Sequence, residues 1–263
     1  MIRAMRTAAS GMLAQQTYVD TIAHNLANVN TTGYKKSRVQ FQDLLYQTVR
    51  PAAGGAPGTL QQMPVALQIG HGTRLVGSPK IFAQGDSETT GNPLDLLIEG
   101  DGFLQFTRPD GTLAYSRDGS LRMDEEGRLV SSEGLPLQPE ISIPAEATGV
   151  QVAKDGTVSV TIPGTTDPQR VGQIELARFI NEPGLSSEGS NLYVATSSSG
   201  QPITGVPGQT GMGNIQQGFL ERSNVEVVEE MVDMIVAQRA YEVNGKSIQA
   251  ADEMMSQGNN IRR

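Results

Sequence analysis

Cysteine and tryptophan are absent from this 263-residue sequence, and aromatic residues make up only 5% of it. A chain without cysteine forms no disulfide and no thiolate zinc site, and it has no thiol nucleophile. Its two histidines, His24 and His71, are too few for a histidine-based metal site. We therefore expect no catalytic, cofactor-binding or metal-binding residue in this chain, and no enzyme activity.

Basic residues are the minority among the charged ones. The sequence holds 20 Lys and Arg against 28 Asp and Glu, which gives a net charge of -8. No basic cluster extends beyond Lys35, Lys36 and Arg38. We expect no nucleic-acid partner, because neutralising phosphates requires clustered basic side chains.

Long hydrophobic runs are also missing. No apolar run approaches the ~20 residues needed to span a bilayer, so we expect no membrane insertion. Near the N-terminus, the polar pair Gln15 and Gln16 interrupts the apolar residues before they form the continuous hydrophobic region of a secretory signal. If the protein works outside the cytoplasm, we expect export by another route, without a cleaved signal peptide.

Acidic residues in the middle of the chain stand mainly in turns. Asp101, Asp110, Asp118 and Asp155 each precede a glycine in a separate turn, without the alternating spacing of a calcium-binding loop. Hairpin turns are the better interpretation. The neighbouring carboxylates at 124–126 could suggest the acid pair of a glycan hydrolase, but adjacent acidic residues in a turn more often form a solvated surface.

Short apolar segments alternate with these turns, and their spacing predicts an antiparallel, meander-rich β domain between about residues 72 and 213. A stretch rich in glycine, serine and proline, 197–213, is expected to be a loop. The predicted strands are 103–107, 113–116, 121–123, 129–130, 158–162 and 173–180.

Both ends of the chain carry apolar residues at a spacing of seven. This spacing keeps one seam of a helix facing a neighbouring helix and is typical of coiled-coil packing. We therefore predict a helix at each end whose apolar stripe forms a subunit interface. The predicted interface residues are Ile2, Met5, Ala9, Met12, Val19 and Leu26 in the first helix and Val227, Met231, Met234, Tyr241, Ile248 and Met255 in the second.

One apolar stripe does not stabilise such a helix alone, because the entropy of ordering the backbone opposes its burial. Pairing the two terminal helices would bury one seam, but Leu13 and Ile22 lie off the main stripe of the first helix. We therefore expect other subunits to cover the remaining apolar surface. We hypothesise that both ends are largely disordered in the monomer, which circular dichroism of dilute protein would test.

Local chemistry predicts features within both helices. Ser223 and Glu226 have the spacing of a capping box, so we predict that they cap the second helix. Gly11 either allows close approach of a neighbouring helix or is simply tolerated at a cost of about 1 kcal/mol. We expect the first helix to end near residues 28–33 and the second to break at 257–260.

These observations predict an α+β fold. The N- and C-terminal helices pair as a coiled-coil-like domain, and a central antiparallel, mainly-β domain lies between them in the sequence. The predicted domains are 1–30, the N-terminal helix; 31–71, an extended connector; 72–217, the β-rich domain; and 218–263, the C-terminal helix.

The run at residues 25–35 resembles the signature of the bacterial flagellar rod and hook protein family. The run at 41–47 resembles the distal-rod members of that family, and the similarity continues through most of the chain before it fades at 256–263. The motif residues that carry the resemblance are Asn25, Leu26, Ala27, Asn28, Thr32, Gly33 and Tyr34.

The resemblance implies a structural subunit that polymerises with itself into a helical tube, the distal rod of the flagellar basal body. It implies that the terminal helices form the inner tube and the β domain the outer layer, and that the rod transmits torque across the periplasm to the hook. The implied partners are further copies of the chain, the proximal rod proteins, the hook protein, the P-ring and L-ring proteins and the flagellar type III export apparatus. The implied location is the rod, from the periplasm to the outer membrane.

Residues 50–63 are open to two interpretations. Their proline and glycine content indicates a flexible linker. The resemblance instead implies a rod-specific segment that bridges adjacent subunits and stiffens the rod relative to the hook.

Two alternative functions remain open. One is a β-rich cell-wall glycan-binding or glycan-cleaving module on a coiled-coil stalk, which needs an aromatic platform or a well-separated carboxylate pair in a cleft. The other is a hook or proximal-rod paralogue, against which the segment 50–63 and the length of the β domain argue.

Overall fold

The computed structural model describes residues 2–50, 65–163, 168–209 and 211–261. The chain divides into two compact units. The first, here called the helical unit, comprises residues 1–26, 37–79 and 227–263. The second, here called the β unit, comprises residues 27–36 and 80–226. Each unit therefore contains segments that are far apart in the sequence.

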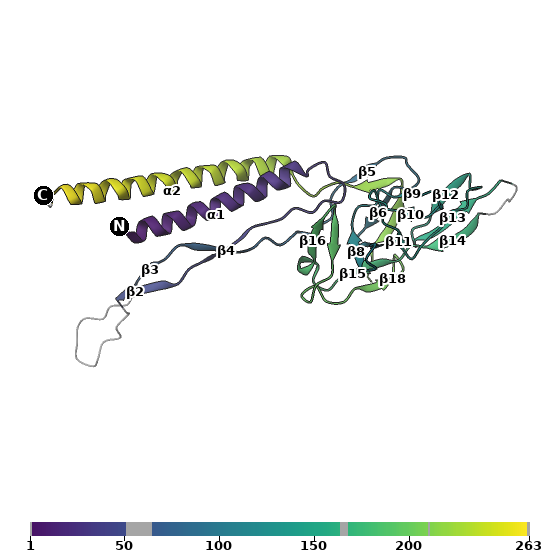
Figure 1. The fold of residues 1–263 in the computed structure, drawn as a ribbon, viewed down its shortest axis with the longest axis horizontal. Helices are drawn as coiled ribbons and strands as arrows, with labels where there is room; N and C mark the ends of the chain where they lie inside the picture. Colours follow the sequence, from purple (N-terminus) through teal and green to yellow (C-terminus); the bar gives the residue numbers. More distant parts are fainter. Residues whose placement is uncertain (1, 51–64, 164–167, 210, 262–263) are drawn as a thin grey trace, which may run out of the picture. The chain divides into compact units, whose positions relative to one another are not determined.

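The helical unit contains α1 (Ile2–Ala27) and α2 (Val227–Ile261), which run antiparallel to each other (Figure 1). Their packing, together with the antiparallel strands between them in the sequence, confirms the predicted α+β class. Glu229 and Glu230 lie in the first turn of α2, where a carboxylate favours the positive end of the helix dipole.

The second helix does not break where the sequence suggests. It continues through 257–260 to Ile261, so that prediction is wrong. Gly258 costs about 1 kcal/mol relative to alanine in a helix interior, which does not end a helix of 35 residues. Among the described residues, no helix is long and apolar enough to cross a membrane.

Four short strands of the helical unit form two successive antiparallel pairs, which together make one long hairpin, here called the ribbon. Phe41 packs edge-on against Tyr18 of α1, with ring centroids 6.1 Å apart, and the backbone N–H of Thr73 donates to Ser10 Oγ at 3.3 Å. The ribbon therefore lies along α1 (Figure 1). It consists of β1 (Gln40–Asp43) paired with β4 (Thr73–Gly77) and of β2 (Tyr46–Arg50) paired with β3 (Leu67–Gly70).

The boundaries between the units differ from the predicted domain boundaries. The sequence suggests a β-rich domain beginning at residue 72, but β4 pairs with β1 and belongs to the helical unit. The segment before α2 is likewise part of the β unit, which extends to residue 226. Of the predicted segment 50–63, only Arg50 is described, as the last residue of β2, and the rest lies outside the described residues.

The β unit consists of short antiparallel strands. Its largest sheet has five strands in the order β11-β7-β8-β17-β16, and a second has three in the order β12-β13-β14. Its strands are β5 (Ser87–Thr89), β6 (Leu96–Glu99), β7 (Leu104–Thr107), β8 (Leu113–Ser116), β9 (Arg122–Met123), β10 (Leu129–Val130), β11 (Leu137–Gln138), β12 (Gly149–Val152), β13 (Thr157–Thr161), β14 (Gln169–Gln173), β15 (Leu176–Arg178), β16 (Ser186–Gly189), β17 (Leu192–Val194), β18 (Ile203–Gly205), β19 (Asn214–Gln217) and β20 (Phe219–Glu221).

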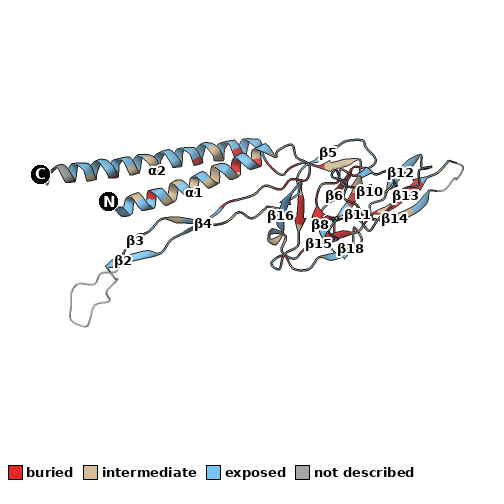
Figure 2. Ribbon diagram, viewed as in Figure 1, coloured by how far each residue is buried: buried red, intermediate tan, exposed pale blue. Residues whose placement is uncertain are grey.

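The aliphatic core lies in the β unit, whereas most of α1 and α2 is exposed (Figure 2). Leu104, Leu137 and Ile174 are fully buried in the main cluster. A second cluster is aromatic, with Phe103 packed edge-on against Phe179. The strand β13 buries alternate residues, Val158 and Val160, as expected for a strand with one face in the core, whereas β6, β7 and β8 bury consecutive residues on both faces.

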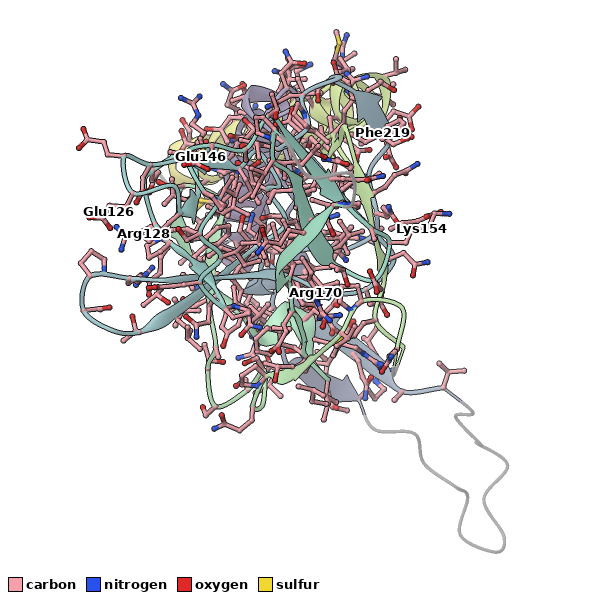
Figure 3. All side chains as sticks on the ribbon, turned by 90° about the vertical axis from the view of Figure 1, so that its right-hand side faces the viewer. Glu126, Arg128, Glu146, Lys154, Arg170 and Phe219 are labelled. Carbon is pink, nitrogen blue, oxygen red and sulfur yellow. The ribbon has the colours of Figure 1, made fainter. Side chains whose placement is uncertain are left out.

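Asp-Gly turns connect the hairpins as predicted. The carboxylates of Asp110, Asp118 and Asp155 each accept a hydrogen bond from the backbone N–H two residues later, at 2.9, 3.0 and 3.1 Å. This Asx-turn geometry confirms the turn interpretation of these aspartates. In the turn before β10, Arg128 and Glu126 form an ion pair of 2.9 Å at the surface (Figure 3).

The stretch 197–213 is not entirely a loop. It contains β18, whose Ile203 pairs with Arg178 of β15. Flanking glycine and proline residues concealed this three-residue strand from the sequence, since short strands carry little periodic signal.

Candidate assembly interface

Small side chains bring α1 and α2 together. A Cβ atom on Gly11 would lie 2.9 Å from Asn244 Nδ2 on α2, so the glycine lets the Asn244 side chain approach α1 without moving aside. The result confirms the close-approach interpretation of Gly11. The buried apolar side chains of the two helices are Ala8, Ala14 and Ile22 of α1 and Ala237 and Ala251 of α2.

Polar bonds fix the same contact. The Tyr18 hydroxyl donates to Asp233 Oδ2 at 2.8 Å, and Asn25 Nδ2 donates to Glu230 Oε2 at 3.2 Å. Asn25 also accepts from the backbone N–H of Ser37 at 3.0 Å, which orders the chain after α1. Burial and the hydrogen bond to Asp233 raise the pKa of Tyr18 to about 12.

The predicted interface stripe is only partly covered within one chain. In α1, Met5, Met12, Val19 and Leu26 are half-buried, whereas Ile2 and Ala9 are exposed. The hydrogen bonds of the intramolecular contact come from polar residues, which the search for apolar periodicity missed. In α2, Met234, Ile248 and Met255 are half-buried, whereas Val227, Met231 and Tyr241 are exposed.

The first part of α2 is apolar on nearly all sides. Between residues 227 and 236 only Glu229, Glu230 and Asp233 are polar. A helix that is apolar all round is normally buried all round, yet α1 covers one side of α2 only. The large apolar side chains of this part that stay at least 40% exposed are Val227, Val228, Met231, Val232, Ile235 and Val236.

The family motif forms a joint within the β unit. Gly33 has φ of +68°, and a Cβ atom there would lie 2.8 Å from the carbonyl carbon of Arg117, so the position requires glycine. The Gly33 N–H donates to the Glu221 carbonyl at 2.8 Å. The segment leaving α1 is thereby bonded to the segment that leads into α2.

Other motif residues support this joint. Asn28 Oδ1 accepts from Thr31 Oγ1 at 3.2 Å, and the Thr32 carbonyl accepts from Asn191 Nδ2 at 2.9 Å. Lys80 Nζ lies 4.5 Å from the centre of the buried Tyr34 ring, a cation–π distance. Of the remaining motif positions, Leu26 is half-buried and Ala27 exposed.

A buried ion triad lies at the centre of the joint. Lys35 Nζ donates to Glu221 Oε1 at 2.5 Å, and both side chains are at most 1% exposed. Arg117 approaches the other oxygen of Glu221 at 3.7 Å and donates to the Gly100 carbonyl at 2.7 Å. Burial lowers the pKa of Lys35, and the Glu221 charge opposes that lowering. Sequence reasoning missed this triad because its members are far apart in the chain.

Asn224 completes the joint. Its side chain accepts from the Lys36 N–H at 2.8 Å and donates to the Ile81 and Ala83 carbonyls at 2.8 and 3.1 Å. Lys35 and Asn224 therefore hold together three segments of the chain, near residues 35, 82 and 223.

The predicted cap of α2 takes another form. Ser223 Oγ accepts a hydrogen bond from the Val225 N–H at 3.3 Å, and α2 begins at Val227. In a capping box, the Ser223 hydroxyl would instead accept a hydrogen bond from the backbone N–H of Glu226. Ser223 therefore forms a turn through its side chain with the backbone of Val225. The prediction that Ser223 and Glu226 form a capping box is wrong. The hydrogen bond from the Lys36 N–H to the Asn224 side chain stabilises this turn.

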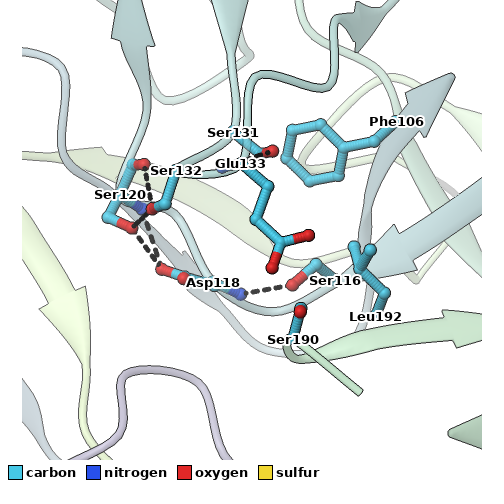
Figure 4. Close-up of a pocket in the computed structure, with 9 residues that line it drawn as sticks. All are labelled: Phe106, Ser116, Asp118, Ser120, Ser131, Ser132, Glu133, Ser190 and Leu192. Atoms are coloured by element: carbon cyan, nitrogen blue, oxygen red, sulfur yellow. Dashed lines mark hydrogen bonds between the residues drawn. The ribbon is translucent and has the colours of Figure 1, made fainter. Parts of the chain in front are cut away.

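A small polar hollow lies among the hairpins of the β unit (Figure 4). It has a volume of about 20 Å³, room for about one water molecule, and Ser116, Asp118, Ser120 and Glu133 are among its lining residues. Ser120 Oγ donates to Asp118 Oδ1 at 2.7 Å, so the polar groups bond to one another. The hollow is too small for a sugar ring. Among the described residues, no group of three His, Asp or Glu side chains could hold a metal ion.

Three family descriptions match the sequence. Residues 5–35 match the flagella basal body rod protein family, residues 97–160 the flagellar hook protein FlgE/F/G D1 domain, and residues 216–261 the flagellar basal body rod FlgEFG protein C-terminal region. The first match includes the motif, and the last includes Asn224 and all of α2.

Individual relatives are similar over the whole length. The chain is 51% identical over 266 residues to the flagellar basal-body rod protein FlgG of Borreliella burgdorferi, covering 100% of both chains. It is 42% identical to the protein of that name from Caulobacter vibrioides, covering 99% of this chain and 100% of the relative. The flagellar hook-basal body complex protein FlhP of Bacillus subtilis is 29% identical, with both chains fully covered.

We predict that Lys35→Met lowers the free energy of unfolding by about 3 to 5 kcal/mol, because it leaves a buried carboxylate without its main partner. Denaturant unfolding followed by tyrosine fluorescence measures the loss. Lys35→Met/Glu221→Gln removes both charges and is expected to lose less than the sum of the single variants.

The matched control for this prediction is Arg222→Met. Arg222 pairs with Glu88 at 3.7 Å, and both side chains are more than half exposed, so we expect a loss of at most about 1 kcal/mol. Equal losses in Lys35→Met and Arg222→Met would contradict a special role of the triad.

We predict a pH dependence of the contact between α1 and α2. The folded pKa of Tyr18 is raised to about 12, above the ordinary value of about 10. Its contribution to stability is therefore complete below pH ~10 and is lost as the pH rises to ~12. The difference between tyrosinate absorbance titrations of the wild type and Tyr18→Phe isolates this phenol and should have its midpoint near 12.

Asp233→Asn is the matching variant for Tyr18. It removes the charge next to the phenol but keeps an acceptor oxygen, so the Tyr18 pKa should fall part of the way towards 10. A wild-type midpoint at the ordinary value would show that the hydroxyl does not bond to Asp233.

Proposed function

The chain belongs to the family of flagellar basal-body rod proteins, and on that premise we propose that its copies polymerise through α1 and α2 into the tubular distal rod. As a rod subunit it is a structural protein. The proposed tube transmits motor torque to the hook, and no enzymatic step is part of this function.

The observation that supports the proposal is the exposed apolar surface of α2. Val228 is 68% exposed and Ile235 57% exposed, although both stand in a segment whose composition is that of a buried helix. The stripe predicted from the sequence adds Ile2 and Ala9 of α1 to this surface. Further copies of the chain are the partners that would cover it in a homopolymer.

The size of this surface favours many weak contacts over one strong contact. A large apolar side chain contributes about 2 kcal/mol when it is fully buried, so half-exposed side chains contribute about 1 kcal/mol each. The six exposed side chains of α2 named above give about 6 kcal/mol, which corresponds to a dissociation constant between the micromolar and millimolar ranges. A stable rod therefore requires that each subunit contact several neighbours, as in an open helical assembly.

The proposed arrangement assigns a role to each part of the chain. The helices α1 and α2 form the inner tube, the β unit forms the outer layer, and the ribbon of β1 to β4 lies along α1, with 50–63 bridging adjacent subunits. The proposed partners besides other copies are the proximal rod proteins, the hook protein and the P-ring and L-ring proteins. The proposed route is the flagellar type III export apparatus, to the rod between periplasm and outer membrane.

We predict that Val228→Glu/Ile235→Glu abolishes polymerisation while the monomer keeps its fold. Exposed helix positions tolerate substitution within about 0.5 kcal/mol, whereas two buried, unpaired charges in every contact oppose assembly. Electron microscopy of concentrated protein measures filament formation, and circular dichroism measures the fold.

The control for this pair is Gln249→Glu/Gln257→Glu, which adds two charges at exposed polar positions of the same helix. It should form filaments like the wild type. Filaments formed by Val228→Glu/Ile235→Glu at wild-type concentration would refute the assignment of the interface.

We predict that deletion of residues 51–62 leaves filaments that polymerise but bend. Arg50 pairs with Leu67 at the end of the ribbon, and the four remaining residues, 63–66, suit a hairpin loop, so the ribbon can still close. Replacement of 51–62 by Gly and Ser at equal length separates the loss of contacts from the loss of length. Curvature in electron micrographs is the readout, and straight filaments from both variants would contradict the bridging role.

A further inference from the structure

A groove between α1 and α2 has acidic side chains on both walls. It has a volume of about 450 Å³ and is lined by Gln16, Val19 and Asp20 of α1 and by Gln238, Tyr241 and Glu242 of α2. Asp20 is exposed. Glu242 lies 3.6 Å from Arg239, but both of those side chains are more than half exposed, so this pair is weak.

Two arginines without such partners lie at the other end of α1. Arg3 and Arg6 are exposed, and α1 has no acidic residue before Asp20. Neither arginine has an ion pair with any residue that the structure describes. At a spacing of three residues they project from the same side of the helix, where they form a compact basic site beside the exposed Ile2.

We propose that Arg3 and Arg6 of one copy dock in the groove of a second copy, between Asp20 and Glu242. This inference rests on the proposed polymerisation and names one of its contacts. The occupant must be another copy, because the arginines and the groove of one chain are about 14 residues apart on the same helix. That separation is about 20 Å, farther than an arginine side chain extends.

The chemistry of the two surfaces is complementary. A guanidinium binds carboxylates through paired N–H donors and stacks on aromatic faces, and the groove offers two carboxylates and the half-exposed ring of Tyr241. The partial positive charge at the N-terminus of α1 adds to the charges of the two arginines. The two sites differ, so the contact is head-to-tail and open-ended. Neighbouring copies that run parallel are offset by about 20 Å along the helix axis.

Charge reversal with mixing tests this contact. Arg3→Glu/Arg6→Glu and Asp20→Arg/Glu242→Arg should each raise the critical concentration for filament formation by about tenfold or more, because like charges then face each other. A mixture of the two should polymerise within about threefold of the wild-type concentration, since each variant's altered site then meets an opposite charge. Sedimentation measures both values, and Lys246→Glu and Glu253→Lys, at exposed positions outside the groove, are the controls.

Engineered cysteines test the geometry independently. The chain has no cysteine of its own, so Arg6→Cys/Glu242→Cys provides the only thiols. Oxidation of filaments should give a ladder of covalently linked chains on a non-reducing gel, whereas each single-cysteine variant should give no product larger than a dimer.

The outcomes separate this inference from the proposed function. Wild-type filaments together with unaffected charge-reversal variants, or without a cysteine ladder, would overturn the docking site and leave polymerisation standing. Wild-type protein that forms no filaments when concentrated would overturn the proposed function, and this contact with it. A ladder and rescue by mixing establish the contact.

Discussion

The helical unit depends on a contact between two helices made by small and polar side chains. Gly11 lies close against the side chain of Asn244, and further along α1 Tyr18 and Asn25 bond to carboxylates of α2. Ile22 of α1 is buried within the chain, contrary to the expectation that another subunit covers it, whereas Leu13 and many large apolar side chains of α2 stay exposed. Cohesion within the subunit and adhesion between subunits therefore use different residues of the same helices.

The β unit meets a different constraint, that of holding two distant chain segments together. The chain leaves α1 through residues 27–36 and approaches α2 through 221–226, and both segments belong to the β unit. The bond from Gly33 to Glu221 and the ion pair between Lys35 and Glu221 join these segments at one place. A buried ion pair contributes little net stability but strongly disfavours any arrangement that separates its partners. The motif thus specifies one arrangement of the two chain passages.

The sequence predicted the hairpins well because their signals are local. An Asp-Gly turn is encoded by two adjacent residues, and Asp110 and Asp155 make the expected turn bonds. The helices were predicted for the same reason, but the side that each helix buries was not. A stripe of alanine and glycine, such as Ala8 and Gly11, carries no hydrophobic period, whereas the stripe at a spacing of seven, which is only partly buried, carries a strong one. The ion triad depends on contacts between residues far apart in the chain, which no spacing reveals.

The polar character of the helix contact also determines which species can assemble. Glu230 is buried, and its charge is bonded to Asn25 of α1. Without α1, that side of α2 would present acidic and amide groups to any neighbour, and covering them with apolar surface would cost several kcal/mol. Only after the two helices pair are those groups satisfied, so that the remaining outer faces are mainly apolar. The need to satisfy these groups favours pairing within one chain before contact between chains, in contrast to the hypothesis that both ends are disordered in the monomer, and circular dichroism of dilute protein distinguishes the two. Both ends of the chain are needed to form a single adhesive surface.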